Sequence, residues 1–192
     1  GMMDTRIDNI PAETPYLQVD AALAEHWQAL LPADGLRVGL VWQGNPKFEN
    51  DADRSLPTLC VLTPLSKLPG VHLIRLQQLS TATCSAATLG MKDLPEEMVD
   101  FADTAAVISG LDLVISVDTA VAHLAGAMGK PCWVMLPHYM PDWRWMTVRE
   151  DSPWYPSMRL FRQRIRGDWV CVVMRIVGAL QKLLTGVEQR QA

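Results

Sequence analysis

Hydrophobic residues occur along the chain in two alternating patterns. Short, mainly apolar runs predict strands at 38–42, 71–76, 113–117, 132–136 and 158–162. The run at 113–117 is β-branched and is expected to be buried on both faces. Between and after the strands lie segments with helical spacing of apolar residues, at 20–31, 59–68, 103–110, 120–128 and 168–184. Asp103 or Thr104 is expected to cap the helix that ends at 110, and Asp168 the last helix. Strands that alternate with helices in this way predict an α/β fold, built on a doubly wound, Rossmann-like parallel sheet.

A weaker apolar run at 90–94 predicts one more short strand. The sheet would then have about six strands in the order 3-2-1-4-5-6, with the switch point between strands 38–42 and 113–117. Ligands of such sheets bind beyond the carboxyl ends of the strands at the switch point. Residues 43–54 and 118–123 are therefore expected to face one another across a crevice.

The remaining segments show weaker patterns. Residues 1–35 are expected to form a linker or extended arm and a lead-in helix capped by Asp20, and residues 36–192 the Rossmann-like domain. The polar stretch 47–54 is predicted to be a mobile loop, and 79–89 a single short helix. A long irregular loop at 137–156 carries tryptophans beside charged residues, which could anchor the loop or stack on a sugar.

The segment 111–131 contains the clearest single unit. A buried strand ends at Asp118-Thr119, an N-cap pair, and a helix follows with small residues on one side and Val121, Leu124, Ala125 and Met128 expected on its core face. A strand, tight turn and helix direct free backbone N–H groups and the positive end of a helix dipole at one point, which suits a phosphate. An ordinary capped crossover without a ligand fits the same pattern.

Composition excludes several partners. The net charge is −4 without a basic run, so nucleic acid is not expected. No apolar stretch is predicted to span a membrane; the best candidate, 169–184, is amphipathic. The four cysteines and four histidines have no metal-ligand spacing, so no metal is expected. Scattered cysteines are most simply buried thiols in a reducing compartment, which favours a cytoplasmic location.

Residues 116–124, Ser-Val-Asp-Thr-Ala-Val-Ala-His-Leu, resemble the Ser-x-Asp-Thr-x-x-x-His-Leu segment of the heptosyltransferase-type glycosyltransferases. Those are GT-B enzymes, with two Rossmann-like domains and a nucleotide-sugar site in the cleft, and the segment lies in their C-terminal, donor-binding domain. From 36 to 184 the chain more closely resembles the C-terminal region of bacterial proteins that join tetratricopeptide repeats to a glycosyltransferase-like module. The residues shared with that group are 38–42, 100–106, 142–145, 149–156 and 160–163.

The resemblance implies roles for one wall of the crevice. Asp118, Thr119 and the amides of Ala120 and Val121 would hold the diphosphate of the donor, with Asp118 near the transferred sugar. His123 lies one turn further along the same helix face and could reach a phosphate or ribose oxygen. A lone histidine is more often a satisfied, partly buried residue, so both interpretations of His123 stay open.

The opposite wall would contain Gly44, Asn45 and Arg54. Gly44 permits close approach of the backbone. Related enzymes place a Lys or Arg in this loop against the diphosphate, where a fixed cation stabilises the charge of the leaving nucleotide without a metal. Arg54 fits this role best because it immediately precedes Ser-Leu-Pro at 55–57, and Lys47 is the second choice.

Gln77 and the loop 99–101, which ends at Phe101, lie at strand ends, where a nucleobase and ribose are expected. Relatives carry Lys-Gly after this glutamine, or an acidic residue that grips the ribose. This chain has Gln-Leu-Ser at 78–80 and no acid until Asp93. Ribose recognition and the identity of the nucleotide therefore stay open.

Two functions from different classes remain. The first is the donor-binding domain of a metal-independent glycosyltransferase, of hexosyl or heptosyl type, which binds a nucleotide-diphosphate sugar without any cofactor. It would be inactive without an N-terminal GT-B domain, and a tetratricopeptide-repeat partner is a second expectation. The alternative is a non-catalytic α/β module that keeps the fold and serves interaction or scaffolding. Gln-Leu-Ser at 78–80 favours the second function; Arg54 and the 116–124 segment favour the first.

Overall fold

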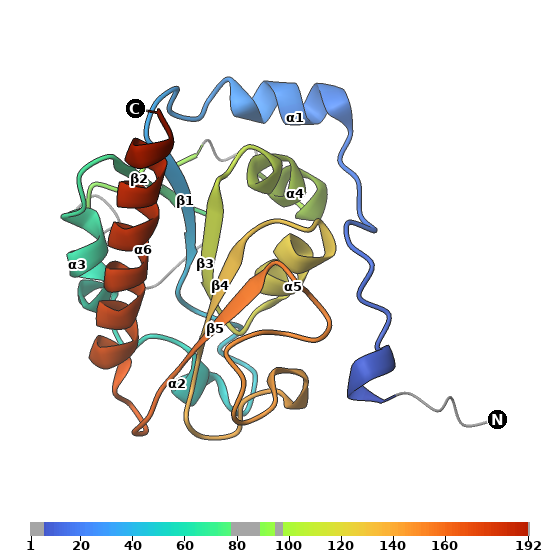
Figure 1. Cartoon of the computed structure of the whole chain (residues 1–192), viewed down its shortest axis with the longest axis vertical. Helices are drawn as coiled ribbons and strands as arrows, with labels where there is room; N and C mark the ends of the chain where they lie inside the picture. The colour runs from blue at the N-terminus through green and yellow to red at the C-terminus, as the bar shows by residue number, and fades with distance from the viewer. Residues whose placement is uncertain (1–5, 78–88, 95–97, 192) are drawn as a thin grey trace.

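The computed structural model describes residues 6–77, 89–94 and 98–191. Its centre is a parallel sheet of five strands in the order β2-β1-β3-β4-β5 (Figure 1). The strands are β1 (Leu36–Val41), β2 (Val71–Arg75), β3 (Leu113–Val117), β4 (Cys132–Leu136) and β5 (Met158–Arg162). Each strand lies within two residues of its predicted bounds, and β1 and β3 are neighbours, as predicted.

The predicted sixth strand is not a strand. In the described part of 90–94 only Lys92 pairs with the sheet, through a single bridge to Ile74. Its amide donates to the Leu73 carbonyl over 2.8 Å, and its carbonyl accepts from the Arg75 amide over 3.0 Å. Gly90, with φ +60°, breaks the extended conformation at the start of this run. The bridge lies beside β2, where strand 3 of the predicted order 3-2-1-4-5-6 was expected. The predicted order therefore holds, but the sheet has five strands instead of six.

Helices cover both faces of the sheet (Figure 1). The 3₁₀ turn η2 (Leu59–Leu62), α3 (Thr63–Ser66) and α6 (Trp169–Gln191) lie on one face, and α4 (Phe101–Ser109) and α5 (Ala120–Ala127) on the other. Helix α1 (Ala21–Gln28) packs on α4 rather than directly on the sheet, with Trp27 buried. Two apolar clusters, one on each face, thus sandwich a sheet whose central strands β3 and β4 are buried throughout, which is the doubly wound arrangement predicted.

Helix caps explain where several elements begin. Asp20 caps α1 through the Leu23 amide (2.9 Å), and Asp168 caps α6 through the Cys171 amide (3.0 Å), as predicted. The prediction for α4 was wrong: its cap is Asp100, not Asp103 or Thr104. The side chain of Asp103 instead completes a capping box by accepting from the Asp100 amide over 3.3 Å. With two acidic residues three apart, the helix takes the earlier one as its cap.

The core face of α5 also differs from the prediction. Ala122, Ala125, Gly126 and Ala127 are buried, whereas Val121, Leu124 and Met128 are only half-buried. A Cβ on Gly126 would lie 2.6 Å from Cγ of Tyr155 and 2.5 Å from Cε of Met158. The helix therefore approaches its neighbours on its small-residue side, because larger side chains would hold it away.

Several segments between the strands contain short helices or 3₁₀ turns. A short helix, α2 (Asp51–Arg54), lies within the stretch 47–54. The helix predicted at 59–68 is divided near Pro64 into η2 and α3. The loop 137–156 contains the 3₁₀ turn η4 (Trp143–Trp145). A further 3₁₀ turn, η1 (Ile7–Asn9), starts the arm, which runs beside α5 and bonds to it through the amide of Tyr16 and the Ala127 carbonyl (2.9 Å). The helix predicted at 79–89 lies almost wholly outside the described residues.

Two predictions that were made from composition, on membrane-spanning stretches and on buried cysteines, are corrected by the structure. Helix α6 contains a window, Trp169–Gly186, that is long and apolar enough to cross a membrane, although no such stretch was predicted. Its buried residues pack against the sheet, which is the arrangement of a core helix; they are Trp169, Val172, Val173, Ile176, Val177 and Leu180. Among the cysteines, Cys132 is buried and Cys171 half-buried, but Cys60 is exposed, so the prediction of buried thiols was wrong for Cys60.

Candidate functional site

Two adjoining cavities open at the carboxyl ends of β1 and β3. The larger, of about 510 Å³, is lined by Val41, Gln43, Gly44, Asn45, Arg54, Leu76, Gln77, Val99, Asp100, Phe101, Thr104, Thr119, Ala120 and Val121. The smaller, of about 330 Å³, is lined by Phe48, Asn50, Arg54, Asp118, Thr119, Ala120, His123, Met140 and Asp142. Residues 43–54 and 118–123 thus face one another, as predicted from the switch point.

Every residue predicted for the site lines one of these cavities. Arg54, Thr119 and Ala120 line both; Asp118 and His123 line only the smaller one. The remaining predicted residues, Gly44, Asn45, Gln77, Phe101 and Val121, line the larger one. The whole predicted loop 99–101, Asp100 included, lines the larger cavity. Sequence reasoning missed Thr104 in the larger cavity, and it gave no role to Asn50, Met140 and Asp142, which line the smaller one.

Arg54 joins the two walls. Its Nη1 donates to the Asp118 carbonyl over 3.3 Å, and its Nε donates to Oδ1 of Asp51 over 3.1 Å. The guanidinium also lies over the Phe48 ring, 4.4 Å from the ring centre. Only 15% of the Arg54 side chain is exposed. The guanidinium is therefore a fixed cation beside the start of α5, rather than a solvated side chain of a mobile loop.

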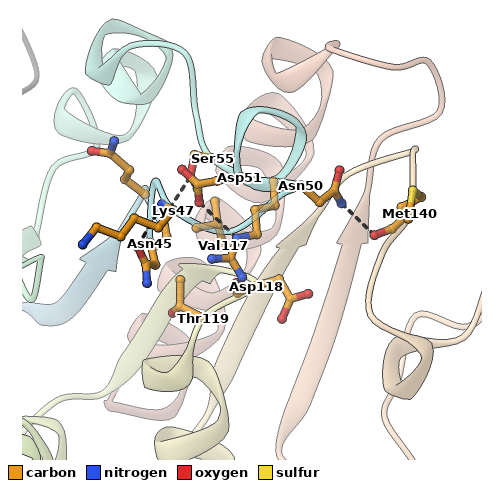
Figure 2. Close-up of polar contacts among 12 residues, drawn as sticks. Asn45, Lys47, Asn50, Asp51, Ser55, Val117, Asp118, Thr119 and Met140 are labelled. Atoms are coloured by element: carbon orange, nitrogen blue, oxygen red, sulfur yellow. Dashed lines mark hydrogen bonds and ion pairs between the residues drawn. The ribbon is translucent and has the colours of Figure 1, made fainter.

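Gly44 is required by that arrangement. A Cβ there would lie 2.5 Å from Nη2 of Arg54 and 2.6 Å from Oδ1 of Asp51. The Gly44 amide donates to Oγ of Ser55 over 2.8 Å, and that hydroxyl donates to Oδ1 of Asp51 over 2.9 Å (Figure 2). Glycine at 44 therefore lets the backbone approach the Arg54 guanidinium and its partner Asp51 closely. The Gly44 amide is not available to a ligand, because it already donates to Ser55.

Gln77 and Lys47 have different surroundings from Arg54. The Gln77 side-chain oxygen accepts from the amides of Trp42 (3.3 Å) and Gln43 (3.0 Å), so it holds the end of β1. Lys47 is exposed and its side chain extends away from Asp118 (Figure 2). Of the two cations proposed for this wall, Arg54 is the one that meets the start of α5.

Thr119 is the N-cap residue of α5 by position, but its side chain makes no capping hydrogen bond. Its hydroxyl pairs instead with Oγ of the buried Ser116 over 2.9 Å. The first N–H groups of α5 are consequently not capped by that hydroxyl and face the cavity that Ala120 and Val121 line. A helix start in this condition suits an anionic group.

His123 is packed on aromatic rings. Its ring stacks on that of Trp145, with centres 5.0 Å apart, and its Nδ1 lies 3.2 Å from the Tyr155 hydroxyl. Burial lowers the pKa of His123, against the opposing effect of the nearby Asp118 carboxylate. Burial and a hydrogen bond with Tyr16 raise the pKa of Tyr155 to about 12. His123 is thus a packed residue that still lines the smaller cavity.

The loop after β4 forms the outer wall of the smaller cavity. Nδ2 of Asn50 donates to the Met140 carbonyl over 2.8 Å and so fastens this loop to the start of α2 (Figure 2). Met140 has φ +47°, a left-handed conformation that costs a side-chain-bearing residue free energy. Asp142, paired with Arg144 at 3.0 Å, completes this wall. The contact of Asn50 with Met140 joins residues far apart in the sequence, and no local pattern indicates it.

Within the same loop, the tryptophans divide into two kinds. Trp145 is buried under His123, so it anchors the loop. Trp143 is 66% exposed and packs edge to face on Trp154. The anchoring interpretation therefore holds for Trp145, while the exposed ring of Trp143 lies on the surface.

Comparison with known proteins adds three findings. Residues 94–135, from the end of the bridge to β4, match the sequence model of glycosyltransferase family 9 (heptosyltransferase). Over 180 residues the chain is 30% identical to Protein FlbA of Caulobacter vibrioides, an alignment that covers 89% of this chain and 30% of FlbA. The chain thus spans less than a third of that relative.

The fold has solved counterparts. The chain is similar to E. coli ADP-heptose lps heptosyltransferase II, with a TM-score of 0.66 and 16% identity, over 93% of this chain and 56% of that one. It is also similar to E. coli heptosyltransferase WaaC with ADP, with a TM-score of 0.52 and 18% identity, over 93% and 53% of the two chains. On this evidence residues 94–135 are similar to glycosyltransferase family 9 (heptosyltransferase), and the fold of the chain is similar to about half of a heptosyltransferase.

Proposed function

We propose that this chain binds the nucleotide-diphosphate sugar donor of a metal-independent glycosyltransferase that transfers a hexosyl or heptosyl group. One observation carries the proposal: the Arg54 guanidinium is fixed against the start of α5, inside a cavity of about 510 Å³. A fixed cation and the free N–H groups of a helix start converge there, which is the combination that a diphosphate needs.

In the proposed complex the diphosphate lies between the two walls. It accepts hydrogen bonds from the remaining N–H groups of Arg54 and from the amides of Ala120 and Val121. The Thr119 hydroxyl adds a bond by turning away from Ser116, to which it donates in the structure because the Ser116 hydroxyl donates to the Val117 carbonyl. As the sugar leaves, Arg54 stabilises the charge that develops on the departing nucleoside diphosphate, so no metal or cofactor is required. Asp118, whose carboxylate faces the smaller cavity, positions the sugar.

The affinity is expected to be modest. Each charge-assisted hydrogen bond contributes about 1.5–3 kcal/mol. Asp51 already compensates part of the Arg54 charge, and the Asp118 carboxylate is close to the same site. Loss of translational freedom opposes binding further. Together these terms give a dissociation constant on the order of 0.1–1 mM for a nucleoside diphosphate.

The acceptor and the general base are proposed to come from another domain. This chain spans about half of each similar heptosyltransferase and less than a third of FlbA. An N-terminal GT-B domain, and a tetratricopeptide-repeat region, are the proposed partners, in the cytoplasm. A chain that holds only the donor cannot orient the acceptor, so on its own it is expected to give little or no transfer.

Ligand-observed NMR with uridine, guanosine and adenosine diphosphates tests donor binding. Arg54→Ala and Thr119→Val should each weaken the binding of whichever nucleotide binds. Arg166→Ala is the matched control, because that arginine pairs with Asp53 of α2 outside the cavity walls. Unchanged binding by both test variants would show that the site is misplaced.

The scaffold function is favoured by one observation: Arg54 has partners within the protein, in Asp51, the Asp118 carbonyl and the Phe48 ring. An arginine that completes a structural network does not require a ligand. If no nucleoside diphosphate binds the wild-type chain at millimolar concentration, the interaction or scaffold function replaces the donor-binding one.

A further inference from the structure

Asp100, in the predicted loop 99–101, brings a carboxylate to the larger cavity from the start of α4. After Gln77 the chain has no acidic residue until Asp93. Asp93 pairs with Arg75 over 2.6 Å and does not line the cavity. Among the described residues that line this cavity, Asp100 is the sole carboxylate.

The backbone of Asp100 is held from both sides. Its amide donates to Oδ2 of Asp103 over 3.3 Å, and its carbonyl accepts from the Thr104 hydroxyl over 2.9 Å. Thr104 is itself buried. The residue therefore has a fixed place at the edge of the cavity, and its carboxylate does not depend on a mobile loop.

Only one carboxylate oxygen of Asp100 serves the helix. Oδ1 accepts from the amides of Ala102 (2.7 Å) and Asp103 (3.0 Å), as the cap of α4. These two bonds fix the plane of the carboxylate. Oδ2 accepts no hydrogen bond from the described part of the chain, and the residue is exposed. An oriented acceptor oxygen is thus available at the cavity.

Apolar side chains flank this oxygen. Val99 is 76% exposed and Phe101 59% exposed, and both line the same cavity. The buried Leu76 and Val41 line it as well. Apolar surface beside a single carboxylate suits a nucleoside, whose base is flat and whose ribose carries hydroxyl donors. In Rossmann-type sites an acidic residue accepts hydrogen bonds from ribose hydroxyls.

We propose that Oδ2 of Asp100 accepts hydrogen bonds from the ribose hydroxyls of the bound nucleoside diphosphate, an inference that rests on the proposed donor-binding function. Asp100 is then a specificity-determining residue, which makes the site prefer ribonucleotides over 2′-deoxyribonucleotides. It reaches the cavity from the start of α4.

Whether the removal of the Asp100 carboxylate weakens or tightens nucleotide binding distinguishes a ribose contact from simple charge repulsion. Removal of a carboxylate from an anion-binding cavity should, by charge alone, tighten the binding of every anion. A ribose contact has the opposite effect on nucleotides and none on an anion without a ribose. Asp100→Asn is the suitable change, because asparagine caps helices as well as aspartate does. Its amide oxygen can keep the cap, which leaves an NH₂ donor where the ribose needs an acceptor.

The experiment compares adenosine diphosphate, 2′-deoxyadenosine diphosphate and inorganic pyrophosphate by NMR titration of the full 192-residue chain. The wild type should bind the ribonucleotide about tenfold more tightly than the deoxyribonucleotide. Asp100→Asn should lose about tenfold for the ribonucleotide and remove the preference, while pyrophosphate binds equally or more tightly. Asp20→Asn, the same change at the cap of α1, is the control and should alter none of the three affinities.

Two failures are distinguishable. If the wild type binds neither nucleotides nor pyrophosphate, the donor-binding function and the role of Asp100 are both overturned. If the wild type binds both nucleotides equally, or Asp100→Asn leaves the ribonucleotide affinity unchanged, only the role of Asp100 is overturned. The comparison of ribo- and deoxyribonucleotide on the wild type needs no variant, so it decides the question even if Asp100→Asn fails to fold.

Discussion

The two walls of the crevice are built by different physical means. The wall after β1 is held by polar side chains, through a connected set that links the Gly44 amide, Ser55, Asp51 and Arg54. The wall after β3 is held by close packing, since Gly126 of α5 touches Tyr155 and Met158 without room for a Cβ. Its start depends on the backbone of α5 and on one hydroxyl pair, Ser116 with Thr119.

This difference predicts how each wall fails. A hydrogen-bonded set of buried polar groups is costly to break, because each partner that remains is left desolvated and unpaired. A close-packed helix tolerates polar changes at its surface but not added volume on its buried side. Substitutions that remove charge should therefore disrupt the first wall, and substitutions that add a methyl group should disrupt the second.

The largest effect is expected from Asp51→Ala. The Asp51 side chain is 10% exposed and accepts from Arg54 and from Ser55, so its removal leaves a mostly buried guanidinium without its carboxylate. We expect a loss of about 3 kcal/mol in the free energy of unfolding, measured by urea denaturation. Asp53→Ala is the matched control on the same helix, because its partner Arg166 is 60% exposed, and it should cost far less. Equal losses from the two variants would contradict the buried network.

Gly126→Ala should disrupt the second wall. Its Cβ would meet Cγ of Tyr155 at 2.6 Å, so the ring or the helix must move. We expect a loss of about 1–3 kcal/mol in the free energy of unfolding, although alanine is the better helix former. Gly178→Ala in α6, where a Cβ meets nothing within 4 Å, should instead stabilise the protein by about 0.5–1 kcal/mol. Stabilisation by both substitutions would show that α5 is not closely packed.

Gly44→Ala should affect ligand binding more than stability. The added Cβ would displace the flexible end of Arg54, 2.5 Å away, from its place beside α5. Pyrophosphate affinity should fall about tenfold, in proportion to one lost charge-assisted hydrogen bond. The measurement is an NMR titration, with Gly178→Ala as the control of unchanged affinity. Wild-type affinity in Gly44→Ala would mean that Arg54 does not contact the anion.

Local patterns were sufficient for most of the fold. The short apolar runs identified all five strands, and the caps Asp20 and Asp168 identified two helix starts, because these signals depend on neighbouring residues alone. The edge of the sheet was less predictable. Whether the run at 90–94 forms a strand or a single bridge depends on its pairing with β2, which no local pattern determines.

The candidate site was predictable where its residues are contiguous or follow a strand. Residues 118–123 and Arg54 could be placed together because the switch point of the sheet brings their loops to one crevice. The supporting contacts could not be predicted. The Arg54 bond to the Asp118 carbonyl spans 64 residues, and the Asn50 bond to the Met140 carbonyl spans 90. Such contacts depend on the finished packing of loops.

The smallest effect is expected from the protonation of His123. Burial against Trp145 lowers its pKa below the ordinary value of 6.5, although the Asp118 and Asp142 carboxylates favour the charged form. Arg144 opposes that charge, and the Tyr155 hydroxyl is the polar contact at Nδ1. The folded chain therefore binds fewer protons than the unfolded chain as the pH falls from 6.5 toward the folded pKa. Stability is lost across that window, and His123 adds no pH dependence above it.

His123→Phe isolates this contribution, because phenylalanine keeps a ring against Trp145 and cannot be protonated. Urea denaturation of both proteins at about pH 7.5 and about pH 5.5 should show the wild type losing stability relative to the variant as the pH falls. The carboxylates titrate in both proteins and cancel in the difference. NMR titration of the His123 imidazole checks the cause directly. A midpoint above 6.5 would mean that the carboxylates of the smaller cavity outweigh burial, and the site would then hold a cation where the structure places a neutral ring.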